Sequence, residues 1–276
     1  MFFKELYQYR SLMREIVAKN IKIQYRNSVL GVFWTLLQPL LTTLVLVLVF
    51  GEIFKSNRAY NFPLYVLTGR LLYEFYSQST KRAMRSITGS ASVLKKVRVP
   101  KYIYPLSNII SNFVTFLISL IVLAGFLAFF LLWPSEKNPP PVINHNILFV
   151  FVPLVVLFLL CIGAGLILST LAVFFKDIEY IYDVFCMLLF YATPVIFDIG
   201  QQSNPALIFA LKINPLYSIV SMFRDCVLYG GNQLPGFAGW PFNPHHLLYS
   251  LGCALVLILI GTLAFWRKQD KFILYI

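Results

Sequence analysis

Residues that could carry out chemistry are scarce in this 276-residue sequence and lie far apart. No glycine is followed by lysine, so the phosphate-binding loop G-x-x-x-x-G-K-[ST] is absent. The histidines and cysteines lack the close spacing of metal ligands or of a disulfide frame. They are His145, His245, His246, Cys161, Cys186, Cys226 and Cys253. We therefore expect no metal site, no resident cofactor and four inert thiols.

One acid and one base lie within an otherwise apolar stretch. Arg70 and Glu74 are four residues apart, which places them on one face of a helix. Two interpretations stay open: the pair neutralises itself inside the membrane, or it faces a polar lumen.

The composition explains why such charges are rare. Hydrophobic residues make up 59% of the chain, aromatic residues 17% and charged residues only 12%, and the mean hydropathy is +0.75. Four uncharged runs, at 29–51, 102–135, 146–175 and 247–266, reach the length of about 20 residues that crosses a bilayer. These numbers exclude a water-soluble enzyme, a disulfide-rich domain and a disordered chain.

The pattern predicts an all-α integral membrane protein with six transmembrane helices. Two of the six are weak, because the second carries Arg70 and Glu74 and the fifth has only a short uncharged stretch. The predicted spans are 29–54, 62–80, 102–133, 147–175, 181–199 and 246–267.

The net charge is +12, and the basic residues are concentrated on one side of the predicted membrane. With the amino terminus inside, 17 basic residues fall on cytoplasmic pieces and five on outer pieces, so the positive-inside rule places both termini in the cytoplasm of a plasma-membrane protein. Anionic lipids and a cytoplasmic partner account for this charge without nucleic acid. The mixed charges before residue 29 also argue against a cleaved signal peptide.

Residues 1–28 form a separate region ahead of the transmembrane domain, 29–276. Polar and apolar side chains alternate there with helical period, which predicts an amphipathic helix at the membrane interface, either a plain anchor or part of a cytoplasmic entrance. The polar set is Lys4, Gln8, Ser11, Glu15, Lys19, Lys22 and Arg26, and the apolar set is Leu6, Tyr9, Met13, Ile16 and Val17.

Two connecting segments are unusual. The cytoplasmic segment 81–101 is basic with interspersed apolar residues, and it could be a docking helix for a soluble partner or a plain basic loop. The outer segment 200–245 is rich in proline, and we expect one or two short re-entrant helices there, with an ordinary loop on the headgroups as the alternative.

Five stretches, spread over nearly the whole chain, carry a family resemblance. They read IVAKNIKIQYRNSVLGVFWTLLQPLL, LLYEFYSQSTKRAMRSITGSASVLKKVRVPKYIYPLSNII, LAVFFKDIEYIYDVFCMLLFYATPVIF, LKINPLYSIVSMFRDCVLYG and FWRKQDKF. In this order and with this topology, they resemble permeases of the ABC-2 type that export lipid-linked polysaccharides and polyol phosphates.

The resemblance implies a transport subunit rather than an enzyme. It implies a homodimer bound to two separate ATPase subunits, which would carry ATP and Mg²⁺, and it makes 84–99 the coupling helix. The residues expected to couple to the ATPase are Met84, Ile87, Val93, Leu94, Lys95, Lys96 and Val97. At the inner headgroup level, Lys19, Lys22 and Arg26 would attract the pyrophosphate of a lipid-linked substrate.

A path for sugars needs aromatic faces and hydrogen-bonding groups. The expected path residues are Trp34, Gln38, Tyr65, Tyr73, Tyr76, Phe190 and Tyr191, although membrane aromatics also serve as anchors or core. The resemblance further implies a lateral gate between the first and fifth spans, where Pro39 and Pro194 would break the helical ladder and let the gate flex.

The expected cargo is a cell-surface glycopolymer. Wall teichoic acid is slightly favoured, because Arg70, Lys212 and Arg224 could attract a polyol phosphate, and O-antigen or capsular polysaccharide comes next. Two alternatives remain: an ABC-2 exporter of small molecules, and a membrane enzyme that processes polyprenyl phosphate.

Overall fold

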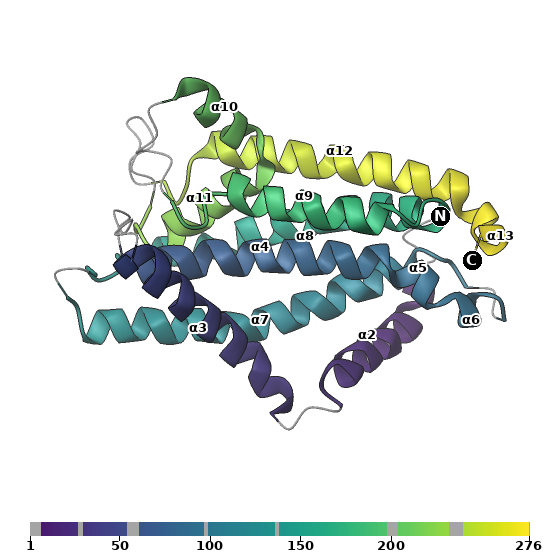
Figure 1. Cartoon of the computed structure of the whole chain (residues 1–276), viewed down its shortest axis with the longest axis horizontal. Coiled ribbons are helices and arrows are strands. Elements are labelled where there is room, and N and C mark those ends of the chain that lie inside the picture. The colour runs from purple at the N-terminus through teal and green to yellow at the C-terminus, as the bar shows by residue number, and fades with distance from the viewer. Residues whose placement is uncertain are drawn as a thin grey trace.

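Helices make up nearly all of the computed structural model, which describes residues 7–26, 30–53, 61–96, 99–135, 138–197, 204–231 and 240–275 (Figure 1). Apolar runs favour helices because a helix pairs its backbone groups within itself. The main helices are α2 (Arg10–Tyr25), α3 (Trp34–Leu46), α4 (Phe62–Met84), α7 (Ile103–Leu132), α8 (Phe151–Phe174), α9 (Ile178–Ala192), α10 (Pro205–Ile213), α11 (Pro215–Val227) and α12 (Pro244–Lys268). The short ones are α5 (Ser86–Gly89), α6 (Ala91–Leu94) and α13 (Phe272–Tyr275).

Asparagine followed by proline begins three of these helices. Asn204, Asn214 and Asn243 each accept a hydrogen bond, 3.0 Å long, from the backbone N–H two residues on. The following proline already has a helical φ and lacks the N–H that the first turn would leave unpaired. The helix starts of the outer segment are therefore encoded locally.

Helix α4 lies at the centre of the bundle and contacts α3, α7, α8, α9 and α11 (Figure 1). Of its 23 residues, 16 are buried, and its charged side chains Arg70, Glu74 and Lys81 are partly exposed. These charges make α4 less apolar than a helix that faces lipid, so it needs protein neighbours. Four other segments are long and apolar enough to cross a membrane: Gly31–Gly51, Ile103–Leu132, His145–Phe174 and Pro244–Tyr275. The chain is thus a multi-pass membrane protein, but the predicted count of six spans is not established.

Helix α9 is shorter than the predicted fifth span, 181–199. It has 15 residues and ends at Ala192. Thr193 is extended, with ψ of 126°, because the ring of Pro194 disfavours a helical conformation in the residue before it. Pro194 therefore ends the helix instead of bending it, whereas Pro39 lies inside α3.

The outer segment contains the two short helices α10 and α11, which meet at an angle of 87°. Nine of the 13 residues of α11 are buried against α4, α8 and α12. That agrees with the expectation of short helices between 200 and 245. Their re-entry into a membrane remains a prediction.

The amino-terminal helix, α5, α6 and α13 gather at one end of the bundle, and α10 and α11 lie at the other (Figure 1). Within α2, Tyr9, Met13 and Ile16 pack against an apolar cluster at the first end, while Lys19 and Lys22 are exposed. The predicted amphipathic pattern is confirmed over the described part of the helix; Lys4 and Leu6 lie outside the described residues.

Candidate functional site

A polar pocket opens between α3, α4 and α7, beside the carboxyl end of α2. Its empty volume is about 540 Å³. Hydrogen-bonding side chains occupy much of its wall, which is unusual in a chain this apolar. The polar and aromatic lining residues are Gln24, Tyr25, Trp34, Thr35, Gln38, Glu74, Phe75, Gln78, Asn112, Thr115, Phe116 and Ser119.

Glu74 connects the walls of this pocket. Its carboxylate accepts hydrogen bonds from Nε2 of Gln38 on α3, at 3.1 Å, and from Nε2 of Gln78 one turn along α4, at 3.0 Å. Arg70 faces the other carboxylate oxygen, with Nε 3.6 Å from Oε2. Those two atoms form an ion pair but no hydrogen bond in the described chain. The two charges therefore compensate each other, as the first interpretation holds, and Glu74 also lines the polar pocket. That the pair faces a polar lumen stays a prediction.

A second pocket, of about 560 Å³, lies on the α9 side of the same residues. Tyr73 and Phe190 form its aromatic wall, with ring centroids 5.1 Å apart. Glu74 and Gln78 line both pockets. The carboxylate therefore lies between the α3 side and the α9 side of α4.

The seven residues predicted to line a path do not come together. Trp34 and Gln38 line the first pocket, and Tyr73 and Phe190 line the second. The other three lie elsewhere. Tyr65 is buried beneath Arg224, Tyr76 is buried on the α8 side of α4, and Tyr191 is 58% exposed.

Arg224, from the outer segment, is only 4% exposed. Its guanidinium donates to the carbonyl oxygens of Pro194 and Tyr65, each at 2.8 Å, and lies 3.4 Å from the centre of the Tyr65 ring. A longer bond, of 3.4 Å, reaches Oγ1 of Thr68. The side chain thus ties α11 to α4 and to the end of α9. The expectation that it attracts an anionic cargo is wrong, because protein carbonyls already surround it.

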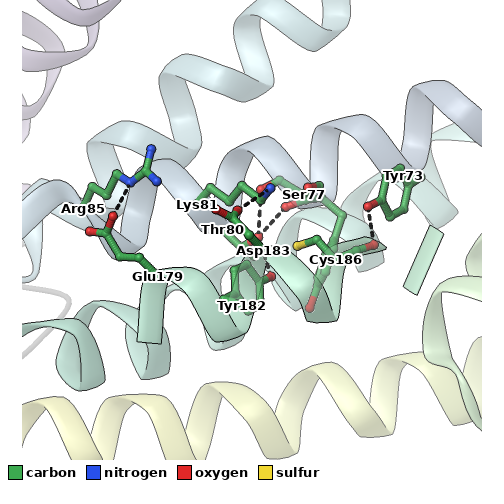
Figure 2. Close-up of polar contacts among 10 residues, drawn as sticks. Tyr73, Ser77, Thr80, Lys81, Arg85, Glu179, Tyr182, Asp183 and Cys186 are labelled. Carbon is green, nitrogen blue, oxygen red and sulfur yellow. Dashed lines mark hydrogen bonds and ion pairs between the residues drawn. The ribbon is translucent and has the colours of Figure 1, made fainter. Parts of the chain in front are cut away.

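A polar seam joins α4 to α9 (Figure 2). Lys81 pairs with Asp183 at 2.7 Å, and Arg85 pairs with Glu179 at 2.9 Å. Farther along, Tyr182 donates to Thr80 at 2.7 Å. The last hydrogen bond of the seam runs from the hydroxyl of Tyr73 to the carbonyl of Cys186, at 2.5 Å. The seam begins one residue before α5, so it links α9 directly to the segment predicted to couple to an ATPase.

Three of the residues expected to couple to an ATPase are buried and cannot contact a partner: Met84, Ile87 and Leu94 are 0%, 0% and 5% exposed. Ile87 and Leu94 fill the interior beneath α5 and α6, and Met84 packs in a separate cluster with Ala172 and Tyr182. Val93 is 43% exposed, and Lys95 and Lys96 are exposed beside it. Val97 lies outside the described residues. The surface left for a partner is therefore small and basic.

The interior beneath α5 and α6 also contains the carboxyl end of the chain. Phe272 of α13 is fully buried in a cluster with Ile87 and Leu94. Lys101 donates to the carbonyl of Gln269 and lies 5.7 Å from the centre of the Phe272 ring. Burial lowers the pKa of Lys101, and Asp270 opposes that shift. This contact fastens the carboxyl end beside the start of α7.

Several residues of the polar pocket were not predicted from the sequence. Gln78, Asn112 and Thr115 are among them, because isolated amides and hydroxyls in apolar runs form no motif. A usable signal was present: Asn108, Asn112, Thr115 and Ser119 recur every three or four residues and mark one polar stripe on a long apolar helix. Among the described residues, no cluster of three metal-ligating side chains occurs.

Comparison with known proteins gives consistent matches over nearly the whole length. The chain is 29% identical over 272 residues to the O-antigen export system permease protein RfbA of Myxococcus xanthus, covering 98% of this chain and 96% of the relative. It is 26% identical to the protein of the same description from Klebsiella pneumoniae, covering 95% and 93%. It is 22% identical to the polysialic acid transport protein KpsM of Escherichia coli, covering 93% and 92%.

A family profile described as ABC-2 type transporter matches residues 11–228, a range that contains α2 to α11 and both polar pockets. The resemblance noted in the sequence is therefore confirmed, and the chain belongs to the ABC-2 type transporter family.

Proposed function

We propose that this chain is the transmembrane permease subunit of an ATP-driven exporter that moves a lipid-linked cell-surface polysaccharide across the plasma membrane. The observation that carries the proposal is the polar pocket between α3, α4 and α7, where an indole, four amides and a carboxylate meet inside an apolar bundle. Sugars present apolar ring faces and many hydroxyls, so they need this combination of groups.

The pocket offers defined contacts to a sugar. The indole of Trp34 is 43% exposed and can stack on a ring face. Glu74 lines the pocket, and its Oε2 atom makes no hydrogen bond within the part of the chain that the structure describes. This atom is buried 3.6 Å from Nε of Arg70, so the Glu74 side chain would rotate to accept a hydrogen bond from a sugar hydroxyl.

The cargo we favour is a polysaccharide of the O-antigen or capsular kind, because relatives are described as an O-antigen export permease and a capsule polysaccharide export inner-membrane protein. Wall teichoic acid is less favoured than the sequence indicated. Of the three cations expected to attract its polyol phosphate, Arg224 is buried against carbonyl groups, Arg70 is paired with Glu74, and Lys212 is exposed. Teichoic acid becomes an outcome of the test.

ATP hydrolysis belongs to separate ATPase subunits in this proposal, since the sequence has no phosphate-binding loop. The ATPase would dock at the end of the bundle that carries α5, α6 and both termini, which would be the cytoplasmic end. Val93, Lys95 and Lys96 are exposed there. The exposed positive charge favours an acidic docking surface on the ATPase.

A second copy of the chain would complete the exporter. The outward face of α9 is apolar and uncovered: Ile181, Val184, Met187 and Leu188 are each at least 62% exposed. The lateral gate of the proposal lies between this face and α3. Pro39 within α3 and Pro194 at the end of α9 are its points of flexibility.

Co-purification with the ATPase encoded beside this chain, followed by ATPase assays in lipid nanodiscs, tests the proposal. Lipid-linked O-antigen or capsular precursors should stimulate hydrolysis, and Trp34→Ala should remove the stimulation. Trp133→Ala is the matched control, because Trp133 is also exposed but lies at the far end of α7. Stimulation by a teichoic acid precursor alone would change the cargo. No ATPase partner, or turnover of a polyprenyl substrate by this chain alone, would overturn the proposal.

A further inference from the structure

An apolar groove lies between α3 and α7, next to the polar pocket. Its empty volume is about 1030 Å³, and none of its side chains carries a polar atom. The lining residues are Phe33, Leu36, Leu37, Leu40, Ile121, Val122, Gly125, Phe126, Phe129 and Phe130. In Figure 1, α3 crosses α7 at a steep angle, and the groove lies between these two helices.

The groove continues from the polar pocket along the same two helices. On α7, the residues from Asn112 to Ser119 line the pocket, and those from Ile121 to Phe130 line the groove. On α3, Trp34 and Gln38 face the pocket, and neighbouring apolar residues face the groove. One molecule lying along α7 would therefore meet polar groups first and hydrocarbon next.

Positive charge is concentrated beside the polar end. Gln24 and Tyr25, the last residues of α2, line the pocket. Lys19, Lys22 and Arg26 belong to the same end of that helix and are exposed. A phosphate group at this level would meet cations instead of hydrocarbon.

We infer that the groove between α3 and α7 binds the hydrocarbon chain of a phosphate-linked glycolipid whose first sugar lies in the polar pocket. The inference rests on the proposed function and locates the lipid anchor of the cargo. It places that anchor within one copy of the chain, on the α7 side of α3, away from the proposed gate between α3 and α9.

The continuity of three environments selects this occupant. A bilayer phospholipid would use the groove and the cations but not the carboxylate and amides of the pocket. A helix from a second copy would fill the groove but would leave the cations and the polar pocket without a ligand. A glycolipid phosphate uses all three.

Gly125 offers a way to block the groove. A Cβ added at this position would meet no atom within 4 Å, so the helix accepts a side chain here and Gly125→Trp would place an indole in the groove. Gly252 on α12 is the matched control, because it too is exposed within a helix and has no atom within 4 Å of an added Cβ. Gly125→Leu is a milder second variant.

The probe is a polyprenyl diphosphate N-acetylglucosamine with a diazirine on its polyprenyl chain, applied to the permease–ATPase complex in nanodiscs. Labelled peptides should map to 33–40 and 121–130. Gly125→Trp should reduce that labelling about tenfold, and Gly252→Trp should leave it unchanged. An unlabelled polyprenyl diphosphate sugar should compete, and phosphatidylglycerol should not.

Labelling only on α9, or labelling that phosphatidylglycerol displaces equally well, would overturn the inference. Its failure is distinguishable from failure of the proposed function. If lipid-linked glycans stimulate the ATPase but the groove is not labelled, the export function is supported and the lipid site is wrong. If the groove is labelled and the unlabelled sugar lipid competes, but no glycan stimulates hydrolysis, the lipid site is supported and the export function is wrong.

Discussion

Helices α8 and α12 approach each other far more closely than α3 approaches α7. A Cβ added at Gly163 would lie 2.7 Å from backbone atoms of Leu257 and Ile258, and one added at Gly261 would lie 2.7 Å from the carbonyl oxygen of Gly163. On α7, by contrast, Gly125 has open space around it. The first contact is a small-residue interface that brings two backbones together, and the second leaves a groove and a pocket.

The difference separates a scaffold from a site. At Gly163 and Gly261 the α8–α12 contact leaves no room for a side chain, and the Arg224 contacts join α11, α4 and the end of α9. The α3 side has loose contacts, hydrogen-bonding groups and an internal proline. A transporter needs both a rigid part and a loosely packed part, because a gate opens by moving relative to helices that stay fixed.

Arg224→Met should have the largest effect, since it removes the guanidinium that links three elements. The carbonyls of Tyr65, Pro194 and Val195 would lose its hydrogen bonds in a buried environment. We expect a loss of about 3–5 kcal/mol in the free energy of unfolding. Denaturant titration in detergent measures it. Arg224→Lys should recover only part of the loss, and a fully stable Arg224→Met would show that the outer segment is not part of the scaffold.

Gly163→Ala should cost about 2 kcal/mol in the free energy of unfolding, because the new methyl group would push α8 away from α12. Gly252→Ala is the control on an open helical surface, where alanine should be neutral or stabilising by up to about 1 kcal/mol. Thermal unfolding of both variants in the same lipid compares them. Equal stability would contradict the assignment of α8 and α12 as a close pair.

Glu74→Gln tests the loosely packed region around α3 and the polar pocket. The amide keeps the size of the carboxylate but loses its charge, so the interaction with Arg70 and one acceptor oxygen are removed. We expect substrate-stimulated ATPase activity to fall about tenfold, equivalent to about 1.4 kcal/mol, with little change in unfolding temperature. A loss of stability with unchanged stimulation would instead assign Glu74 to the scaffold.

Lys81→Met should have the smallest effect on folding. Its partner Asp183 is 46% exposed, and an ion pair this open contributes about 0.5 kcal/mol. Coupling provides the sharper readout: if the seam links α5 to α9, the variant should retain basal ATPase activity but lose part of the stimulation by substrate. The double variant with Lys81→Asp and Asp183→Lys should restore the stimulation by substrate. If it does not, the ion pair has no role in coupling.

Local patterns predicted much of this molecule. The helical class, the amphipathic α2 and the short outer helices follow from periodicity, proline positions and uncharged runs, and the family follows from the resemblance of five sequence stretches. What escaped prediction depends on contacts distant in sequence. Arg224 is bonded to residues 156 and 159 positions away, so nothing near it indicated burial. The apolar residues of α5 and α6 were expected to contact a partner, but Ile87 and Leu94 pack against Phe272, which is more than 170 positions away in the sequence.

The sequence did not distinguish the close contact between α8 and α12 from the open contact between α3 and α7. Gly125, Gly163 and Gly252 all lie in long apolar helices, and composition gives no reason to treat them differently. Their environments depend on which helix lies opposite, and tertiary structure alone supplies that information.

The most direct measurement of the central claim is translocation itself. Proteoliposomes containing this chain and its ATPase would receive a fluorescent polyprenyl diphosphate oligosaccharide, and the fraction accessible to an external glycosidase would be followed. We predict an ATP-dependent change in that fraction that needs both subunits and is slowed about tenfold by Glu74→Gln. An intact, ATP-hydrolysing complex that moves no lipid-linked glycan, or that moves only small soluble compounds, would contradict the account.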